Sequence, residues 1–541
     1  MKGLMQDWPL TVPKVLSHAA RFHGSRELVS AALEGAPART SWESVEIRAR
    51  RLASALGRRG FSQGDRIATL AFNSARHIEC WYAVAGTGAV YHTLNPRLLP
   101  EQIAWIANHA GDCALFFDPF LADIVVKLAP LMPGVRLYVA LTDRAGLPAA
   151  ALPDLIAYED LVAEGDGNFA WPELDENTAC GLCYTSGTTG DPKGVLYSHR
   201  SNVLHAMMGC SADTLAFTAK DTVLPVVPMF HANGWGIPFA AAMAGAKLVL
   251  PGPRLDGASL CRLFTEEKVT LTAAVPTVWL GMLRHLDETG TRLPHLKKIV
   301  IGGAACPRAM IDAFERKHGI EVVHSWGMTE MSPIGTVGSL TATTEALPWE
   351  QRLDVKARQG RPPFGVEMKI TDIEGRELPR DGVTSGRLKV RGPAVAGAYF
   401  RNADASPFDA AGWFDTGDVA TLDQDGIMTV TDRAKDVIKS GGEWISSIQI
   451  ESLAMSHPAV AEAAVIGVKH PKWDERPLLI VVLKPGQSAA KGDILAFLTG
   501  KIAKWWVPDE VVFVDSIPHS ATGKIQKTAL RERFAGFVLP Q

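Results

Sequence analysis

Short apolar runs rich in β-branched residues alternate with helical patterns through most of the chain, up to about residue 360. The candidate strands are residues 66–72, 114–117, 135–140, 271–275 and 298–301, and a helix-like stretch lies around residues 77–85. This rhythm predicts an α/β fold, in which helices pack on mostly parallel sheets. With 541 residues the chain also exceeds what one core supports, so we expect more than one domain.

The pattern changes after about residue 360. Residues 367–372, 387–391 and 427–431 alternate apolar and polar side chains, with glycine-rich turns between them. Alternation with a period of two is typical of antiparallel strands that have one solvent-exposed face. We therefore expect a small β-barrel-like subdomain at the end of a large N-terminal domain.

A third pattern begins near residue 435. Short strand-like runs lie at residues 463–468, 478–483 and 511–514. They surround a stretch in which Ile494, Leu495, Leu498 and Ile502 share one helical face. The remaining length suffices for a separate domain. The sequence thus predicts a small, mobile α+β domain at the C-terminus.

Charge and hydropathy exclude several classes of protein. The net charge is −3, from 55 Lys and Arg against 58 Asp and Glu. Such a balance does not attract nucleic acid or anionic lipid over long range. We find no run approaching the roughly 18 apolar residues that span a bilayer. The N-terminus lacks the apolar core of a signal peptide, and Val15, Ala19 and Phe22 recur there at helical spacing after Pro13.

Seven cysteines without regular spacing do not form a disulfide framework. Cys180 and Cys183 form a C-x-x-C pair, but a second pair that a zinc site would need is missing, and the stretch is apolar. We interpret both as buried structural thiols. A reducing cytoplasm fits this cysteine usage.

The strongest motif is the sequence YTSGTTGDPKG at residues 184–194, which follows the apolar stretch 179–184. Its glycines let backbone N–H groups approach an anion, its hydroxyls donate hydrogen bonds, and Lys193 can neutralise phosphate charge. The motif does not match the Walker pattern G-x-x-x-x-G-K-[ST], which disfavours that class of nucleotide hydrolase. The alternative interpretation is a flexible surface loop.

This phosphate loop resembles that of the adenylate-forming superfamily, which holds acyl-CoA synthetases, luciferases and peptide-synthetase adenylation domains. Six further motifs match in the expected order, at residues 228–235, 302–307, 326–333, 412–418, 431–442 and 522–527. Residues 94–98, 225–231 and 441–447 are similar to bacterial fatty-acid–CoA and 3-methylmercaptopropionate–CoA ligases. One departure is Arg387, at a position where the family often has Glu.

The resemblance implies ATP, Mg²⁺ and CoA as cofactors or cosubstrates. It assigns Mg²⁺ to Thr185 and Glu330, Thr329 to the α-phosphate, and Asp418 with Arg433 to the ribose. The implied cofactor-binding residues are Thr185, Ser186, Gly187, Thr188, Thr189, Lys193, Gly302, Gly303, Ala304, Ser325, Trp326, Gly327, Met328, Thr329, Asp418, Arg433, Gly441, Gly442 and Trp444. Taken alone, Glu330 could equally be a solvated residue of a turn.

The resemblance also implies five catalytic residues: Lys524, Lys439, His231, Trp235 and Glu330. Lys524 would contact the attacking carboxylate and the α-phosphate, while Lys439 lies on the opposite face of the small domain. By position alone Lys524 would be a solvated surface lysine, and His231 and Trp235 would be a satisfied buried histidine and a core aromatic residue. In the family this Trp gates the acyl tunnel.

The implied activity is an acyl-CoA ligase that forms acyl-AMP and then transfers the acyl group to CoA. The domain boundaries are then residues 1–433, a hinge at 434–436 that contains Lys435, and residues 437–541. Trp326 replaces a Tyr common in long-chain enzymes, which favours short or medium acids or 3-methylmercaptopropionate. The expected partners are the acid, ATP, CoA and a second copy of the chain, with no nucleic acid and no integral membrane association.

Three other functions remain open at this stage. A long-chain fatty-acid–CoA ligase would differ only in its acid. An enzyme with the same first step could pass the acyl group to a carrier-protein thiol. A nucleotide-binding sensor without catalysis would retain the ATP-binding groups alone.

Overall fold

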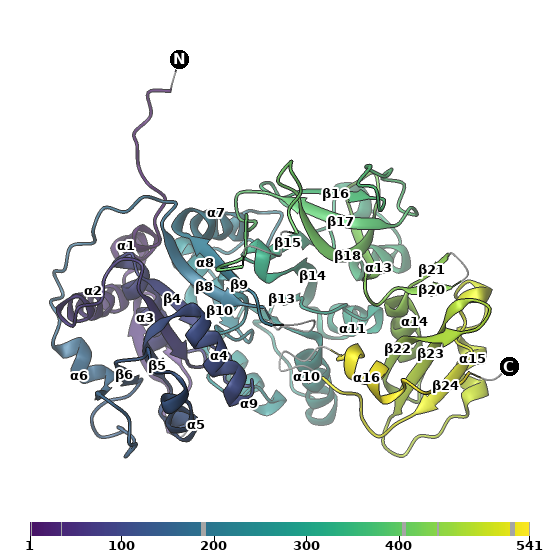
Figure 1. Cartoon of the computed structure of the whole chain (residues 1–541), viewed down its shortest axis with the longest axis horizontal. Helices are drawn as coiled ribbons and strands as arrows, with labels where there is room; N and C mark the ends of the chain where they lie inside the picture. Colours follow the sequence, from purple (N-terminus) through teal and green to yellow (C-terminus); the bar gives the residue numbers. More distant parts are fainter. Residues whose placement is uncertain are drawn as a thin grey trace.

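The computed structural model of the chain describes residues 1, 3–33, 35–185, 191–402, 407–440, 443–519 and 525–539, without the side chains of residues 443 and 444. Figure 1 shows a large N-terminal part and a smaller C-terminal part at opposite ends of the longest axis. Within the described residues, no helix is long and apolar enough to cross a membrane.

The first large sheet has the strand order β7-β6-β5-β3-β4-β8-β9. All of its pairings are parallel except that of β8 with β9, which is antiparallel. Its strands are β3 (Arg66–Leu70), β4 (Val90–Thr93), β5 (Asp112–Phe117), β6 (Tyr138–Ala140), β7 (Leu155–Ala157), β8 (Ala179–Tyr184) and β9 (Gly194–Ser198). The antiparallel hairpin of β8 and β9 therefore stands at one edge of a parallel sheet.

The second large sheet has the order β15-β14-β13-β12-β10-β11-β1-β2 and is parallel except at its two edges. Its strands are β1 (Glu27–Ser30), β2 (Ala38–Ser41), β10 (Thr222–Pro225), β11 (Lys247–Leu250), β12 (Leu271–Ala274), β13 (Lys298–Ile301), β14 (Glu321–Gly327) and β15 (Ile334–Val337).

One core cluster lies between the two large sheets and holds the helices that separate them. These helices are α1 (Val12–His23), α2 (Trp42–Arg58), α3 (Ala75–Gly86), α7 (His199–Cys210) and α8 (Ile237–Ala244). Successive strand residues face opposite clusters: Ile67 joins this core, whereas Ala68 joins the cluster on the outer face. Both faces of each sheet are thus buried, as apolar runs in parallel strands require.

Further helices cover the outer faces. They are α4 (Pro100–Ala110) and α5 (Ala122–Leu128) on the first sheet, and α9 (Gly257–Glu266), α10 (Pro276–Thr289), α11 (Arg308–Asp312) and α13 (Trp349–Ala357) on the second. Two short helices, α6 (Tyr158–Ala163) and α12 (Ala342–Glu345), lie in connections. The result is alternating helix and sheet layers, which confirms the predicted α/β class.

A smaller antiparallel sheet follows, with the order β16-β17-β18-β19. Its strands are β16 (Glu367–Thr371), β17 (Gly386–Arg391), β18 (Phe414–Leu422) and β19 (Met428–Arg433). They coincide with the three runs of alternating residues and add β18. Arg387 on β17, at the position where the family often has Glu, forms an ion pair with Asp415 on β18, with 2.9 Å between Nε and Oδ2. The charge of this unusual arginine is therefore paired.

The C-terminal sheet has the order β21-β20-β23-β22, with β24 beside β23. Its elements are β20 (Ile438–Ser440), β21 (Glu443–Ile445), β22 (Val460–His470), β23 (Asp474–Leu483) and β24 (Glu510–Phe513), with helices α14 (Ser447–Met455), α15 (Lys491–Leu498) and α16 (Lys527–Arg533). Two core clusters of their own lie on the two faces of this sheet. A separate α+β domain is therefore present, as predicted.

Two details differ from the predicted helical faces. Phe22 belongs to α1, but it is 64% exposed, whereas Val15 and Ala19 are buried. α15 ends at Leu498, so Ile502 lies outside it. The backbone is extended at Thr499 and left-handed at Gly500, which has φ +80°. Cys180 and Cys183 are buried thiols on β8, as expected.

Candidate active site

The hairpin of β8 and β9 carries the phosphate loop. At its neck the Thr185 N–H donates to the Lys193 carbonyl at 2.9 Å, and the Lys193 N–H donates to Thr185 Oγ1 at 3.1 Å. Four predicted loop residues, Ser186, Gly187, Thr188 and Thr189, lie outside the described residues. The described neck nevertheless shows how an antiparallel pair of strands holds both ends of a glycine-rich loop together.

The turn after β14 carries Thr329 and Glu330, which are 8% and 5% exposed. The hydroxyl of Tyr399 donates to Glu330 Oε1 at 2.6 Å, and the hydroxyl of Tyr197 on β9 donates to the Thr329 carbonyl at 2.6 Å. Burial and the adjacent Glu330 carboxylate raise the pKa of Tyr399, which keeps its phenol protonated as a donor. Glu330 is therefore a buried carboxylate in a fixed position rather than a solvated residue of a turn.

Asp418 on β18 is 3% exposed and has two neighbours that fix it. Arg433 on β19 pairs with its Oδ1 at 2.8 Å, and the indole Nε1–H of Trp326 donates to its Oδ2 at 3.0 Å. Ser325 lies next to Trp326, and its Oγ is buried without a hydrogen-bond partner within the described part of the chain. An orphaned donor beside a held carboxylate fits a site that a bound polar ligand completes.

Three small residues, Gly302, Gly303 and Ala304, follow β13, and the two glycines lie against the indole of Trp235. A Cβ added at Gly302 would lie 3.0 Å from the Trp235 ring, and Gly303 has φ +81°. Both positions therefore favour glycine. The indole of Trp235 and the backbone at Gly302 therefore lie side by side.

Trp235 belongs to a left-handed turn over Ala232–Gly236, in which Asn233 has φ +35° and Trp235 has φ +56°. Non-glycine residues rarely adopt this conformation, so the turn is strained. It packs on His205, whose Nδ1 would lie 2.5 Å from a Cβ at Gly236. Burial lowers the pKa of His205 to about 3, so its ring is neutral and its Nε2 accepts from the Ile334 N–H at 3.1 Å.

His231 precedes this turn and lines a small hollow with Thr185, Leu94, Asn95 and Phe230. The hollow has a volume of about 20 Å³ and so holds about one water molecule. His231 and Thr185, at the neck of the phosphate loop, thus line one cavity.

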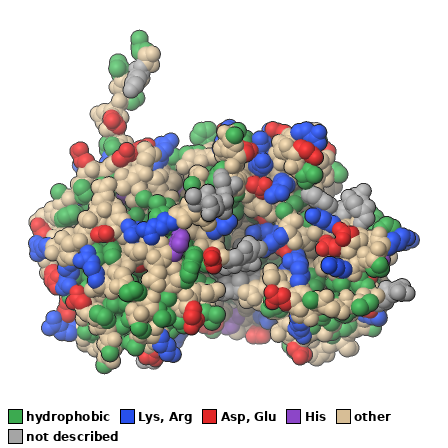
Figure 2. Space-filling view, in the orientation of Figure 1, with side chains coloured by type: hydrophobic (Ala, Val, Ile, Leu, Met, Phe, Trp, Pro, Cys, Tyr) green, Lys and Arg blue, Asp and Glu red, His purple; other side chains and the backbone are tan. Residues whose placement is uncertain are grey.

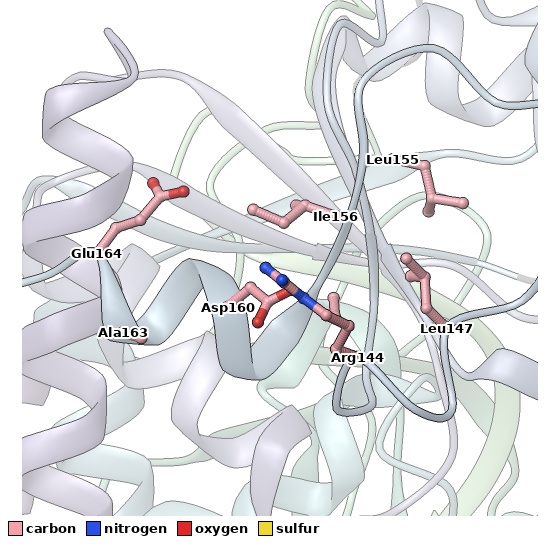
Figure 3. Close-up of a pocket in the computed structure, with 8 residues that line it drawn as sticks. Arg144, Leu147, Leu155, Ile156, Asp160, Ala163 and Glu164 are labelled. Carbon is pink, nitrogen blue, oxygen red and sulfur yellow. The ribbon is translucent and has the colours of Figure 1, made fainter.

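A larger depression of about 620 Å³ lies elsewhere, between β7, α6 and the segment before them (Figure 3). Arg144 points across it toward Asp160, with which it forms an ion pair at 2.9 Å. None of its described lining residues is a predicted site residue. We assign the chemistry to the smaller site and not to this open depression.

Of the predicted site residues in the C-terminal domain, only Lys439 has a described side chain. Lys439 lies on β20, is exposed, and its N–H donates to Glu475 at 3.0 Å. β21 pairs Trp444 with Lys439 in register, but the side chain of Trp444 lies outside the described residues, as do Gly441, Gly442 and Lys524. Their predicted roles stay predictions.

At the junction of the two parts, Asp432 on β19 is 1% exposed. Its Oδ2 accepts from both the N–H and the hydroxyl of Ser447 on α14, each at 2.6 Å. Lys527, the first residue of α16, donates to the same hydroxyl and pairs with Glu451 at 2.8 Å. The hydrogen bonds between Asp432 and Ser447 cross the predicted hinge, where desolvation lowers the pKa of Lys435.

Sequence reasoning missed Tyr399, Tyr197, His205 and Asp432. The first two donate hydrogen bonds to the turn with Thr329 and Glu330, and their partners lie 69 and 132 residues away along the chain. No local pattern marks a tyrosine as the partner of so distant a residue. Asp432 stands inside a recognised motif, and its burial beside a predicted ribose-binding arginine was the signal that could have singled it out.

The residues present also fit the implied metal and nucleotide. Mg²⁺ prefers oxygen ligands, and Glu330 and Thr185 offer a buried carboxylate and a hydroxyl. Lys193, Asp418 and Arg433 are of the types that bind phosphate and ribose. No group of three or more His, Cys, Asp or Glu that could hold a metal ion occurs among the described residues.

Two family models match this chain: AMP-binding enzyme over residues 16–400, and AMP-binding enzyme C-terminal domain over residues 449–524. The first match spans well over half of the sequence. The chain belongs to the AMP-binding enzyme family. The second match ends at Lys524, the predicted catalytic lysine.

Relatives of this AMP-binding enzyme match along the whole chain. It is 51% identical over 534 residues to a 3-methylmercaptopropionyl-CoA ligase of Ruegeria lacuscaerulensis, covering 99% of both chains. It is 49% identical over 539 residues to a medium-chain-fatty-acid–CoA ligase of Ectopseudomonas oleovorans, covering 100% of this chain and 98% of the relative. The structure of ATP-bound MatB from Rhodopseudomonas palustris is similar, with a TM-score of 0.83 and 25% identity over 98% of this chain and 99% of that one.

The role of the Trp326 indole in this AMP-binding enzyme can be tested by a substitution at Gly335, which packs against the indole ring. A Cβ at Gly335 would lie 2.4 Å from two indole carbons of Trp326. We expect Gly335→Ala to displace the indole, break its hydrogen bond to Asp418, and weaken AMP binding about tenfold or more, measured by calorimetry.

Gly281 in α10 is the matched control, because a Cβ there meets nothing within 4 Å. Gly281→Ala should leave AMP affinity unchanged. Wild-type affinity in a folded Gly335→Ala protein would show that the indole does not hold the nucleotide site.

Proposed function

We propose that the protein is an ATP-dependent acyl-CoA ligase. In the first step the carboxylate of an acid attacks the α-phosphate of ATP, which gives acyl-AMP and pyrophosphate. In the second step the CoA thiol attacks the acyl carbon and releases AMP. A free carboxylate is a poor acyl donor because oxide would have to leave, whereas AMP is a good leaving group.

One observation carries this proposal: the two family domains are present together, and Asp418, Arg433, Glu330 and Lys193 are retained in held positions. The relatives named as CoA ligases support CoA as the acceptor. The sequence also retains Lys439 and Lys524, the two predicted catalytic lysines, and their presence together with the ATP-binding groups argues against a sensor that has lost catalysis.

We assign binding and orientation of ATP to the large domain. Asp418 would accept from the ribose hydroxyls, with Arg433 and Trp326 keeping its carboxylate in place. Lys193 and Thr329 would contact phosphate oxygens. Glu330 and Thr185 would hold Mg²⁺, which offsets phosphate charge when bound. Because these groups are oriented before the substrate arrives, little reorganisation is needed during reaction.

The C-terminal domain would serve the two steps in turn. Lys524 would stabilise the charge that develops during adenylation, and after rotation about residues 434–436 the segment that begins at Lys439 would line the path of the CoA thiol. The hydrogen bonds from Ser447 to Asp432 join the two parts close to this hinge. A rotation about residues 434–436 would have to rearrange these hydrogen bonds, so Asp432 would influence how readily the domain rotates.

We infer a short or medium acid, with 3-methylmercaptopropionate as a leading candidate. The indole of Trp235 lies against Gly302, Trp326 stands where long-chain enzymes commonly have a Tyr, and the relatives named above support acids of this size. The second candidate, a long-chain enzyme, requires Trp235 to move aside, and the strain in its turn would favour such movement.

An acid panel tests the activity and the chain length together. Pyrophosphate release is measured with ATP, Mg²⁺ and CoA for butyrate, 3-methylmercaptopropionate, octanoate and palmitate. We expect kcat/KM for palmitate to be at least about tenfold below that for the best shorter acid. The reverse order would establish the long-chain alternative.

Two further outcomes of the panel would contradict the proposal. Pyrophosphate release without CoA-dependent release of AMP would indicate a carrier-protein acceptor. Tight ATP binding without acid-dependent pyrophosphate release would indicate a sensor.

The role of Lys524 is tested by separating the two steps. Lys524→Ala should lower acid-dependent pyrophosphate release at least about 100-fold, because a charge that acts in the transition state is lost. The reaction of preformed acyl-AMP with CoA should continue. Lys504→Ala, at an exposed lysine of the same domain, is the matched control and should retain both steps. Wild-type pyrophosphate release in Lys524→Ala would exclude the assigned role.

We also propose a homodimer in the cytoplasm. The N-terminal segment extends from the body of the protein (Figure 2) and exposes Leu4, Met5 and Trp8, which are 93%, 88% and 58% exposed. A second copy would cover this apolar segment.

Sedimentation of the wild-type protein at micromolar concentration should give twice the chain mass. Trp8→Asp should shift the sedimenting species toward monomer. Ile373→Asp, which changes a residue 77% exposed outside the N-terminal segment, is the control and should leave the dimer intact. A monomeric wild type would refute this assembly.

A further inference from the structure

The segment of residues 394–400, between β17 and β18, joins the two halves of the phosphate site. Its Phe400 N–H donates to the Gly194 carbonyl at 2.8 Å, at the start of β9. Its Ala396 N–H donates to the Glu330 carbonyl at 2.7 Å. The hydroxyl of Ser332, two residues after Glu330, donates to the Ala394 carbonyl at 2.8 Å. The phosphate loop and the turn with Glu330 are thus attached to one short segment.

Tyr399 lies near the end of this segment and contacts two charged groups, Glu330 and Lys193. Its hydroxyl donates to Glu330 Oε1 at 2.6 Å, and its ring centroid lies 4.9 Å from Lys193 Nζ. The ring also packs on Cys183, Val195 and Tyr197 of the β8–β9 hairpin. One side chain therefore touches the predicted metal ligand and the predicted phosphate-binding lysine.

Both contacts have a physical consequence for these groups. A buried carboxylate is costly unless it accepts hydrogen bonds, so the phenol stabilises Glu330 in one orientation. A carboxylate oxygen has two lone pairs, so one accepted hydrogen bond does not prevent it from binding a cation. The negative face of the ring attracts the Lys193 ammonium and keeps it beside the loop.

We propose that Tyr399 is a positioning residue that holds Glu330 and Lys193 ready for the metal–nucleotide complex. This inference rests on the proposed function. The phenol hydroxyl orients the Glu330 carboxylate, which binds the divalent cation. The ring holds the Lys193 ammonium, which binds the phosphates, in position. Removing each part of the side chain should therefore change a different property of the site.

The test compares two substitutions at this position. Tyr399→Phe keeps the ring and loses the hydrogen bond, so we expect the dissociation constant of Mn²⁺ in the enzyme–ATP complex, measured by electron paramagnetic resonance, to rise about tenfold or more. AMP affinity without metal should not change. Tyr399→Leu also loses the ring, so metal-free ATP affinity should fall several-fold while AMP affinity is retained.

Tyr158→Phe is a matched control, because the Tyr158 hydroxyl donates at 2.7 Å to another buried carboxylate, Glu79, which is not a site residue. It should leave the Mn²⁺ dissociation constant at the wild-type value. An unchanged constant in folded Tyr399→Phe, or an equal rise in Tyr158→Phe, would overturn the proposal.

Binding of Mn²⁺ and nucleotide is measured without an acid or CoA. The test therefore remains informative if the acid panel shows no ligase activity, in which case only the proposed function fails. If the panel succeeds and the Mn²⁺ constant does not respond to Tyr399→Phe, only the role of Tyr399 fails. The Mg²⁺ concentration that gives half-maximal activity provides a second readout and should rise in parallel in Tyr399→Phe.

Discussion

Burying an ionised carboxylate costs several kcal/mol unless another group of the protein takes the place of water. Glu330 and Asp418 are 5% and 3% exposed, and each accepts hydrogen bonds from side chains of other strands or segments. Tyr399 holds the first, and Arg433 with Trp326 holds the second. Because each carboxylate must find a partner, the segments that carry the partners are brought to the same place. The predicted nucleotide-binding residues are positioned by these hydrogen bonds.

The same requirement applies at the junction with the C-terminal domain. Asp432, which directly precedes the predicted ribose-binding residue Arg433 on β19, accepts hydrogen bonds from Ser447, and Lys527 pairs with Glu451 beside it. Lys527 lies three residues after Lys524. The chain just after the predicted catalytic lysine is therefore anchored to the same cluster that meets the large domain. A change of domain orientation and the position of that lysine are coupled through this cluster.

Much of the fold was predictable because periodicity is a local property. The strand expected at Lys298–Ile301 matches β13 residue for residue, and the alternating runs after residue 360 form antiparallel strands. The predicted helical faces were wrong where a residue's spacing along the sequence did not match its tertiary surroundings or the local backbone conformation. Phe22 has the right spacing but lies at the end of α1, where no neighbouring element covers it sufficiently. The helix ends at Leu498 because the backbone becomes extended at Thr499 and left-handed at Gly500, so Ile502 cannot continue its face.

The sequence by itself determined the α/β class, the glycine- and hydroxyl-rich chemistry of the phosphate loop, and which carboxylates and lysines are candidates for the reaction. Those properties depend on residues close together in the chain. Only the tertiary structure decided that Tyr399 donates a hydrogen bond to Glu330, that Trp326 donates one to Asp418, and that Ser447 donates to Asp432. A hydrogen bond between residues far apart in sequence forms because the packed sheets bring the two groups within about 3 Å, and no local pattern records that distance.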